Sequence, residues 1–130
     1  MKHKDITAKA IDCAYKVHNT IGFGFLERVY QNALLIELEK NGLQAEKEVP
    51  IKVFYEEKIV GDYIADIIVE GKVVLELKSV KEIHPAHEVQ LTNYLKATGI
   101  EVGLLINFAE SVQVKRRVFT PEPKEKNQSV

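Results

Sequence analysis

The chain has 130 residues, which suits one domain, and its 45% hydrophobic and 28% charged residues are typical of a soluble globular protein. No apolar run approaches the roughly 20 residues that a membrane-spanning helix needs, so we expect no membrane partner. The formal net charge of −1 lacks the positive excess of many nucleic-acid-binding proteins. The single cysteine, Cys13, cannot form an internal disulfide, so we expect a reducing, cytoplasmic location.

Apolar residues at three- and four-residue steps predict two helices at the start of the chain. Asp5 is the expected N-cap of the first helix, which ends at Gly22 and is followed by a tight turn. The second helix is predicted over residues 26–40, with Asn41 and Gly42 as its C-cap. Because this second helix is apolar over much of its circumference, we expect it to be buried on more than one side.

The apolar period then changes to two, which is typical of strands. Residues 49–53 and the residues from 59 onward predict two strands joined by a turn near residues 56–57. A second turn at residues 70–71 leads to a third strand over residues 73–77.

Pro85 is predicted to open a third helix that runs to about Thr98, with Gly99 behind it. Residues 102–108 are almost continuously apolar, which predicts a strand covered on both faces. Residues 112–118 alternate with polar side chains, which predicts a more exposed final strand.

The predicted element order is therefore α-α-β-β-β-α-β-β, an α/β fold in which helices flank a central mixed sheet. The first three strands suggest an antiparallel meander, and the following strand–helix–strand unit suggests a right-handed crossover to a parallel neighbour. Residues 1–119 are predicted to form a single domain, and residues 120–130, which lack core residues before the terminus, a disordered tail.

Three charged residues interrupt apolar strands. Glu76 and Lys78 are two residues apart and so share one face of the third strand, and Asp66 interrupts the strand before it. Charges in such surroundings are costly unless they are paired or bound to metal. Two carboxylates and an ammonium group that converge could bind a hard divalent cation and hold a water beside it. The alternative is a solvated strand face with cross-strand Asp–Lys ion pairs.

The register of the hairpin between these two strands tests whether Asp66 and Glu76 lie on the same face of the sheet. A two-residue loop at Glu70 and Gly71 would place Asp66 opposite Leu75, on the wrong side of the sheet. A three-residue loop, or an equivalent bulge, places Asp66 opposite Glu76 with both on one face. A metal site requires the second register.

On the third predicted helix, His87, Gln90 and Tyr94 follow at three- and four-residue steps and so share a face. Gln90 and Tyr94 would lie beside the polar site, although a half-buried tyrosine with a packing role fits Tyr94 equally well. Glu27 opens the second helix, where the helix dipole favours an acid whatever its function.

The densest basic cluster, Lys115, Arg116 and Arg117, lies on the last predicted strand. Lys115 and Arg117 share one face, so if that face is near the site the pair would contact phosphates rather than bases. The alternative, which we favour slightly, is a charged edge strand that resists sheet-to-sheet aggregation.

The segment Gly24-Phe-Leu-Glu27-Arg-Val-Tyr30 resembles the signature of the GxxExxY family, a branch of the PD-(D/E)XK nuclease superfamily. The resemblance extends from about residue 6 to residue 119, and the order and spacing of its motifs make it specific. The other segments that carry it are Val17-His18, Gly22, Glu76-Leu-Lys78, Gln90-Leu-Thr-Asn-Tyr94 and Gly103-Leu-Leu-Ile-Asn107-Phe108.

This resemblance implies a restriction-endonuclease-like core of order α-β-β-β-α-β and a magnesium site, in which manganese can substitute. Asp66, Glu76 and the backbone carbonyl of Leu77 would ligate the metal, Glu27 would support it, and Lys78 would orient the attacking water. The proline that usually precedes the aspartate is replaced by Ala65.

The resemblance also implies residues that hold the substrate. Gln90 and Tyr94 match the Gln-x-x-x-Tyr motif of RecB-like nucleases, where these residues position the substrate strand. Tyr30, which closes the GxxExxY signature, is grouped with them. His18 matches a histidine frequent in that branch, for which metal contact and a satisfied helix histidine are equally good interpretations. His87 is the weakest candidate.

The sequence thus predicts a metal-dependent nuclease that hydrolyses phosphodiester bonds of nucleic acid, with DNA favoured. The alternative is a non-catalytic or partner-dependent nucleic-acid-binding subunit that retains the nuclease fold. The small size of the chain and its low basic charge are compatible with a homodimer or a larger complex.

Overall fold

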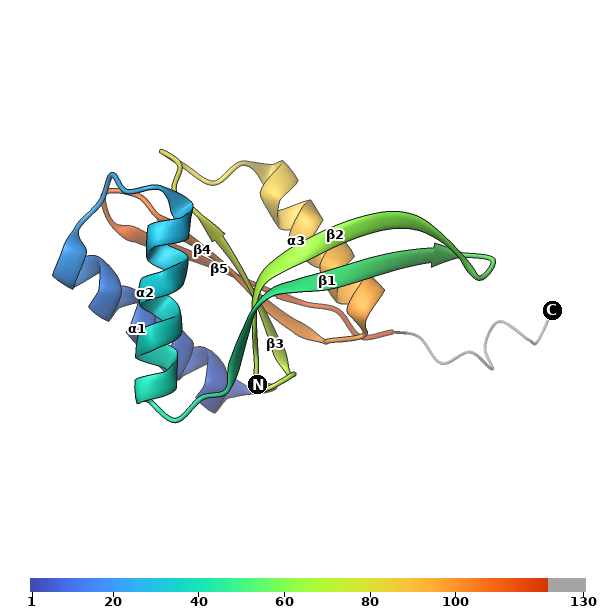
Figure 1. The fold of residues 1–130 in the computed structure, drawn as a ribbon, viewed down its shortest axis with the longest axis horizontal. Coiled ribbons are helices and arrows are strands. Elements are labelled where there is room, and N and C mark those ends of the chain that lie inside the picture. Colours follow the sequence, from blue (N-terminus) through green and yellow to red (C-terminus); the bar gives the residue numbers. More distant parts are fainter. Residues whose placement is uncertain (122–130) are drawn as a thin grey trace.

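The computed structural model describes residues 1–121, and the rest of the predicted tail lies outside this range. The elements follow the predicted order α-α-β-β-β-α-β-β (Figure 1). Their bounds are α1 Lys4–Ile21, α2 Glu27–Lys40, β1 Ala45–Tyr55, β2 Lys58–Val69, β3 Val73–Lys78, α3 Pro85–Thr98, β4 Val102–Phe108 and β5 Val112–Val118.

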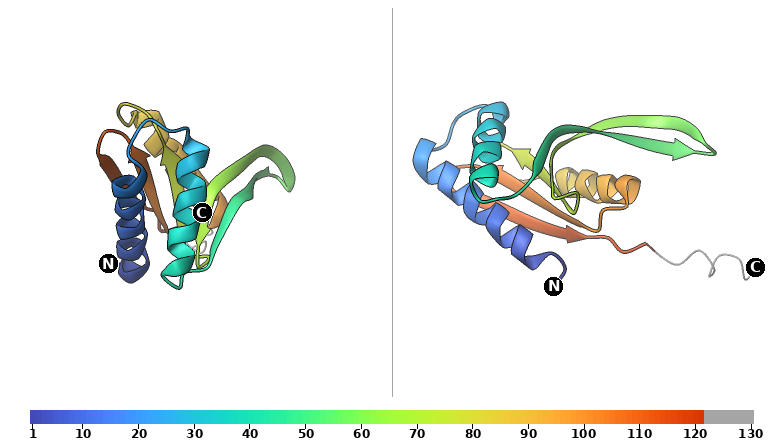
Figure 2. Two further views of the ribbon diagram at one scale, coloured as in Figure 1. Left: turned by 60° about the vertical axis from the view of Figure 1, so that its left-hand side comes forward. Right: turned by 60° about the horizontal axis from the view of Figure 1, so that its bottom comes forward.

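The strands form one mixed sheet in the order β1-β2-β3-β4-β5. Neighbouring strands are antiparallel except β3 and β4, which run parallel and are joined through α3. The helices α1 and α2 cover one face of the sheet and α3 covers the other (Figure 2). The predicted α/β architecture is therefore confirmed.

The helix ends differ from the prediction in one place. The helix α1 begins at Lys4 with His3 as its N-cap, so Asp5 lies in the first turn rather than at the cap. An acid in the first turn is still favourable, because the helix N-terminus carries partial positive charge. The predicted ends at Gly22, at Asn41 and Gly42, and at Gly99 are all found.

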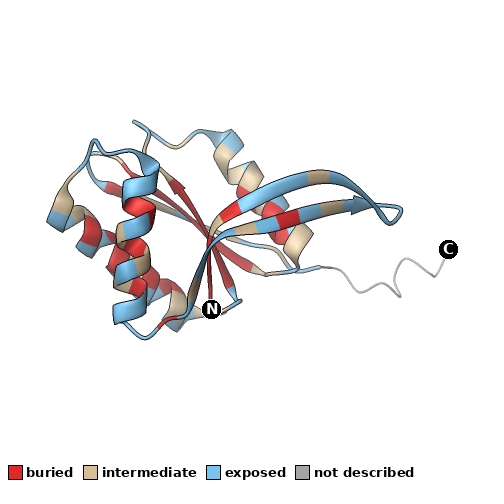
Figure 3. Cartoon of the chain, viewed as in Figure 1, coloured by how far each residue is buried: buried red, intermediate tan, exposed pale blue. Residues whose placement is uncertain are grey.

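The core is divided between the two faces of the sheet. The larger cluster lies under α1 and α2, and it joins residues such as Tyr30, Leu34 and Phe108 to inward side chains of β2 to β5, with Ala45 of β1 packed against it. Cys13 is buried there, as its helical position predicts. The smaller cluster lies under α3 and includes Leu91, Tyr94 and Leu105 (Figure 3).

The expectation that α2 is buried on more than one side is met in part. The helix packs against both α1 and the sheet, with Tyr30, Gln31, Leu34 and Leu38 buried. Ala33 and Leu35 are partly buried against the same cluster. The outer side of the helix is open to solvent, where Ile36 is 60% exposed (Figure 2).

The helix α3 is seated closely on β4. Pro85 opens the helix, where its missing N–H has no intrahelical partner to lose. A Cβ added at Gly103 of β4 would lie 2.7 Å from Leu91 Cδ1, so glycine at this position leaves room for the close packing of α3 on β4.

Among the described residues, no helix is long and apolar enough to span a membrane.

The strands β1 and β2 are longer than predicted and extend beyond the rest of the sheet. We call residues 49–64 the arm; it curves over α3 and ends in the predicted turn at Glu56 and Glu57 (Figure 1). Much of the arm is exposed (Figure 3). Its inner side, through the buried Ile51 and the partly buried Val49, joins the cluster under α3.

Candidate active site

The site is built where the ladder between β2 and β3 stops. Val69 pairs with Val73 and Ile67 with Leu75, which leaves a three-residue loop between the strands. This is the second of the two registers considered above, so the prediction that Asp66 lies opposite Glu76 rather than Leu75 is confirmed.

Beyond Ile67 and Leu75 the strands part, and side chains take over the cross-strand bonding. The backbone N–H of Asp66 donates to Glu76 Oε1 at 3.1 Å. In return, the backbone N–H of Leu77 donates to Asp66 Oδ2 at 2.7 Å. Each carboxylate is thus held by the backbone of the opposite strand, and the two acids are fixed against one another.

The bend in β2 explains why the strands part at Asp66. Ile67 packs under α1 and α2, but Ala65 packs under α3, so the buried side of the strand changes within two residues. On β1, Glu48 has a left-handed φ of 52°, and no Glu48–Asp66 pair forms in the ladder. A residue other than glycine in this left-handed backbone conformation costs on the order of 1 kcal/mol. Backbone strain of this kind is common at functional sites.

Glu76 is 5% exposed and forms no ion pair among the described residues. Burial, together with the negative charge of Asp66, raises the pKa of Glu76 to about 8. The hydrogen bond from the Asp66 N–H and the charge of Lys78 lower this pKa, but they offset only part of the rise. Burial likewise raises the pKa of Asp66 and of Glu27, and Lys78 opposes both shifts. Asp66 and Glu76 therefore repel one another in a poorly solvated place, with the more exposed Glu27 nearby, and a bound cation would stabilise their ionised forms.

Asp66 opens into a recess of about 250 Å³ on the side of α2. Its lining includes the acids Glu27 and Glu48 and the backbone of Leu77, with Arg28 at one wall. Carboxylate and carbonyl oxygens are the ligands that Mg²⁺ prefers, and Mg²⁺ usually keeps several waters. The donor set therefore fits a hard divalent cation, although among the described residues no three His, Cys, Asp or Glu side chains form a ready-made metal cluster.

Lys78 stands at the end of β3, two residues beyond Glu76 and half-buried. Its positive charge lowers the pKa of Asp66, Glu76 and Glu27 alike. In the part of the chain that the structure describes, it forms no direct salt bridge. The predicted alternative of a simple Asp–Lys ion pair is thus not found.

The helix α3 brings Tyr94 and Gln90 to the same side. Burial and the charges of Glu76 and Asp66 raise the pKa of Tyr94 to about 12, so its hydroxyl lies within reach of their field. The Tyr94 ring lies 5.8 Å from that of Tyr63 on the arm. Gln90, one turn earlier, is half-buried and lines the space between α3 and the arm.

Comparison with known protein families matches residues 4–118 to the PD-(D/E)XK nuclease superfamily. The chain belongs to this superfamily. Membership supports a nuclease-type function on nucleic acid, and PD-(D/E)XK nucleases generally use divalent metals. A search of curated proteins found no match.

Among solved structures, the chain is similar to one described as the crystal structure of SSO0001, with a TM-score of 0.57 and 22% sequence identity over 77% of this chain. The chain spans about half, 53%, of the length of that protein. At this identity the likeness concerns the fold alone. It agrees with the restriction-endonuclease-like core that PD-(D/E)XK nucleases share.

Tyr30 is the clearest correction to the predicted site of this PD-(D/E)XK domain. It is fully buried, its ring stacks on Phe108 at 4.4 Å, and its hydroxyl donates to the Gly22 carbonyl at 2.7 Å. It also accepts a bond from the backbone N–H of Phe25. Tyr30 therefore holds the turn between α1 and α2 and cannot contact a substrate.

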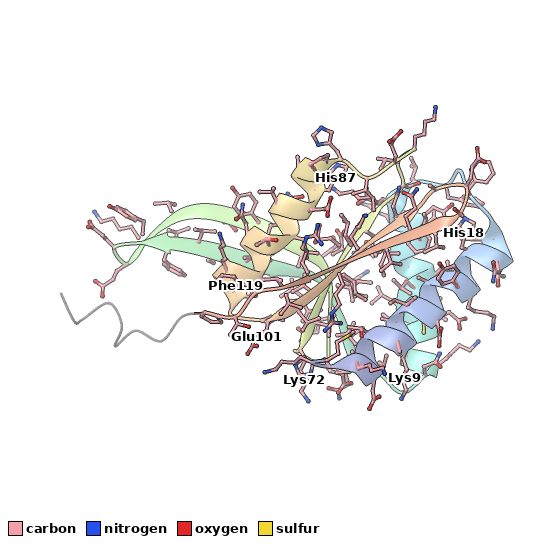
Figure 4. The ribbon with its side chains drawn as sticks, turned by 180° about the vertical axis from the view of Figure 1, so that it is seen from behind. Lys9, His18, Lys72, His87, Glu101 and Phe119 are labelled. Carbon is pink, nitrogen blue, oxygen red and sulfur yellow. The ribbon has the colours of Figure 1, made fainter. Side chains whose placement is uncertain are left out.

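The two histidines lie apart, at the end of α1 and at the start of α3 (Figure 4). His18 Nε2 lies 2.8 Å from the Ala109 carbonyl, which fits the interpretation as a satisfied helix histidine. His87 Nδ1 accepts the backbone N–H of His84 within a capping box. Both histidines thus have structural partners in the described chain.

The basic pair on β5 is not directed at the nuclease site. The Arg117 guanidinium bonds Glu88 of α3 and the backbone carbonyl of Arg116. Lys115 shares its face, and β5 is the edge strand, separated from β2 by β4 and β3. Among the described residues Arg117 contacts Glu88 and the Arg116 carbonyl rather than the candidate site, so the charged-edge alternative, which the sequence analysis favoured, fits better than contact with phosphates there.

Two residues of the site escaped the sequence analysis. Gln31 Nε2 donates to the backbone carbonyl of Asp66 at 2.9 Å and so ties α2 to the acid. Its position one turn after Glu27 was a usable signal, because residues four apart share a helix face. Nothing in the sequence around Glu48 indicated a site residue, because its approach to the recess at Asp66 depends on the bend of β1.

Proposed function

We propose that this chain is a nuclease that hydrolyses phosphodiester bonds, with DNA as the favoured nucleic acid and with Mg²⁺, or Mn²⁺ in its place. The observation that carries the proposal is the exchange of hydrogen bonds between Asp66 and Glu76. It holds two poorly solvated carboxylates together, and within residues 1–121 no lysine, arginine or histidine side chain is bonded to either. Natural proteins rarely keep such an arrangement unless it binds something positive.

Asp66, Glu76 and the carbonyl of Leu77 would hold the cation, and Glu27 would support it from α2. The cation would supply an activated water and relief of charge on the phosphate. Lys78 orients the attacking water through its ammonium group, a compact donor that does not compete for a metal ligand position. Gln90 and Tyr94 position the substrate strand from α3.

Within the superfamily we assign the chain to the GxxExxY family and to the RecB-like branch. Gly24, Glu27 and Tyr30 carry the first resemblance, and Gln90 and Tyr94 the second. A cytoplasmic location fits the single buried thiol of Cys13. A homodimer or larger complex remains a prediction.

The test is cleavage of labelled single- and double-stranded DNA and RNA with Mg²⁺, with Mn²⁺ and with chelator. We expect metal-dependent cleavage that Asp66→Asn and Lys78→Ala each lower by about 100-fold or more. Metal titration by calorimetry should show that Lys78→Ala still binds the cation. Lys72→Ala is the matched control, because Lys72 is exposed on the adjoining loop. An Lys78→Ala variant as fast as the wild type would remove Lys78 from the mechanism.

A second function, a binding subunit active only with a partner, is favoured by the net charge of −1, which lacks the positive excess of many nucleic-acid-binding proteins. It predicts metal and nucleic-acid binding without cleavage by the isolated chain. Cleavage by the purified chain at catalytic concentrations would exclude it.

A further inference from the structure

A groove of about 700 Å³ runs between the arm and α3. The arm contributes Lys52, Phe54 and Tyr63 to its walls, and α3 contributes Asn93, Tyr94 and Lys96. Among the described residues that line it there are two lysines and no carboxylate, although the whole chain is slightly acidic. The volume falls within the roughly 300–1,000 Å³ of ordinary ligand sites.

The groove presents aromatic rings to solvent. Phe54 is 61% exposed and Tyr63 is 47% exposed, while Tyr94 is buried beneath them with its ring tilted by 47° to that of Tyr63. Large apolar groups that stay exposed along a groove mark a binding surface more often than a folding requirement. Tyr94 belongs to both places, because it lines the groove and also packs in the cluster under α3 with Ala65, the residue before Asp66 on β2. The groove therefore adjoins the proposed active site.

We infer that this groove binds a single strand of nucleic acid, with bases stacked on Tyr63 and Phe54 and phosphates beside Lys52 and Lys96. The inference rests on the proposed function and specifies its substrate as single-stranded. The strand would lie along the arm and pass Tyr94 to reach the site at Asp66 and Glu76.

The balance of charge and aromatic surface decides between one strand and two. A duplex hides the faces of its bases and offers mainly phosphates, so the affinity of a duplex binder depends on many phosphate contacts from lysine and arginine. Two lysines cannot supply that, but exposed rings can stack unpaired bases of any sequence. A groove with few cations and free aromatic faces therefore suits unstacked bases.

Both lysines have weak partners that a phosphate can replace. Lys52 Nζ lies 2.9 Å from Asp62 Oδ2 in an exposed ion pair, and such pairs contribute little to stability. Lys96 Nζ lies 5.9 Å from the centre of the Phe119 ring. Asp62 should therefore compete with the substrate for Lys52, and Asp62→Asn should tighten binding severalfold.

The experiment is fluorescence anisotropy with labelled oligothymidylate, oligouridylate and a DNA duplex of equal length, in buffer with chelator so that no cleavage intervenes. We expect either single strand to bind at least tenfold more tightly than the duplex. Tyr63→Ala should weaken binding about tenfold, whereas Tyr63→Phe, which keeps the ring, should bind like the wild type. Lys52→Ala should reduce the salt slope by about 0.7.

The control variants are Tyr15→Ala and Lys9→Ala on α1, on the opposite side of the sheet (Figure 4). Both should leave affinity unchanged. Duplex binding as tight as single-strand binding, or a Tyr63→Ala variant with full affinity, would overturn the inference. So would arm variants that change the mass measured by light scattering but not the affinity, because the arm would then be a self-association surface.

Cleavage assays separate this inference from the proposed function. If binding depends on the Tyr63 ring but no metal supports cleavage, the inference about single-strand binding in the groove is supported and the nuclease proposal fails. If the wild type cleaves and Tyr63→Ala binds as tightly as the wild type, the nuclease proposal stands and the groove inference fails.

Discussion

The two faces of the sheet differ in what their burial achieves. Under α1 and α2, a continuous cluster of buried side chains involves strands β2 to β5, with Ala45 of β1 packed against it. Under α3 the cluster is smaller, and beside it on β3 lies the buried carboxylate of Glu76. Asp66 lies between the two regions, because it lines the recess on the side of α2 with Glu27 and Gln31. The first region is built almost wholly from apolar contacts, whereas the second adjoins groups that oppose folding.

The difference indicates that one region mainly stabilises the fold and the other mainly carries the candidate site. Charged groups in poorly solvated places cost stability, so they need a scaffold whose stability comes from elsewhere. The parallel pair β3 and β4 joins the two faces, because its alternate residues point to each. Residues Leu75 and Leu77 belong to the apolar face, and Glu76 between them belongs to the site.

The largest expected effect on folding is on the apolar face. Leu34→Ala should lower the free energy of unfolding by about 2–5 kcal/mol, because Leu34 is fully buried and leaves a cavity. Ile36→Ala, two residues along the same helix and 60% exposed, should cost less than about 0.5 kcal/mol. Urea denaturation measures both. Equal losses in the two variants would mean that α2 does not pack as described.

The next effect is a dependence on pH at the face of α3. Because the pKa of Glu76 is raised from 4.5 to about 8, the folded state binds a proton that the unfolded state releases above its ordinary pKa. Stability should therefore fall, not rise, as pH increases from about 4.5 to about 8, by on the order of a few kcal/mol. The raised pKa values of Asp66 and Glu27 act in the same direction.

Urea midpoints across this pH range should show the fall, and Glu76→Gln should flatten it and stabilise the protein at the alkaline end. Glu56→Gln, at the exposed tip of the arm, is the control and should change nothing. Addition of Mg²⁺ at high pH should recover stability in the wild type but less in Glu76→Gln. A flat profile in the wild type would show that Glu76 is better solvated than described.

The smallest predicted effect concerns the turn between α1 and α2. Tyr30→Phe keeps the stacking on Phe108 but removes the bond to the Gly22 carbonyl, so it should cost about 1 kcal/mol. Cleavage per folded molecule should be almost unchanged, because Tyr30 lies in the core. A large loss of cleavage activity with an unchanged free energy of unfolding would mean that Tyr30 does contribute to the substrate site.

Most of the fold could be predicted because local signals agree with the tertiary structure. Pro85 and Gly99 bound α3, and the apolar run of β4 is buried on both faces, as such a run in a parallel pair should be. The hairpin between β2 and β3 offered only two registers, and the need to keep Asp66 and Glu76 on one face selected the correct one.

The rest depends on contacts between distant segments, which spacing cannot show. Tyr30 closes a motif that contains a site residue, yet only the approach of Phe108 and Gly22 reveals that it is buried. Arg117 was placed on the correct face of its strand, but its partner Glu88 comes from another element. The length of the arm was also missed, because its exposed apolar residues blur the alternation that defines a strand.

Gly103 allows the side chain of Leu91 on α3 to lie directly against the backbone of β4, because a Cβ at this position would lie 2.7 Å from Leu91 Cδ1. A methyl group at residue 103 would therefore force Leu91, which is fully buried, to shift within the layer between α3 and the sheet. Gln90 precedes Leu91 directly, and Tyr94 follows it within one turn, on the same helix. Packing at an uncharged position on β4 is thus linked through one helix to both residues that we propose to position the substrate strand.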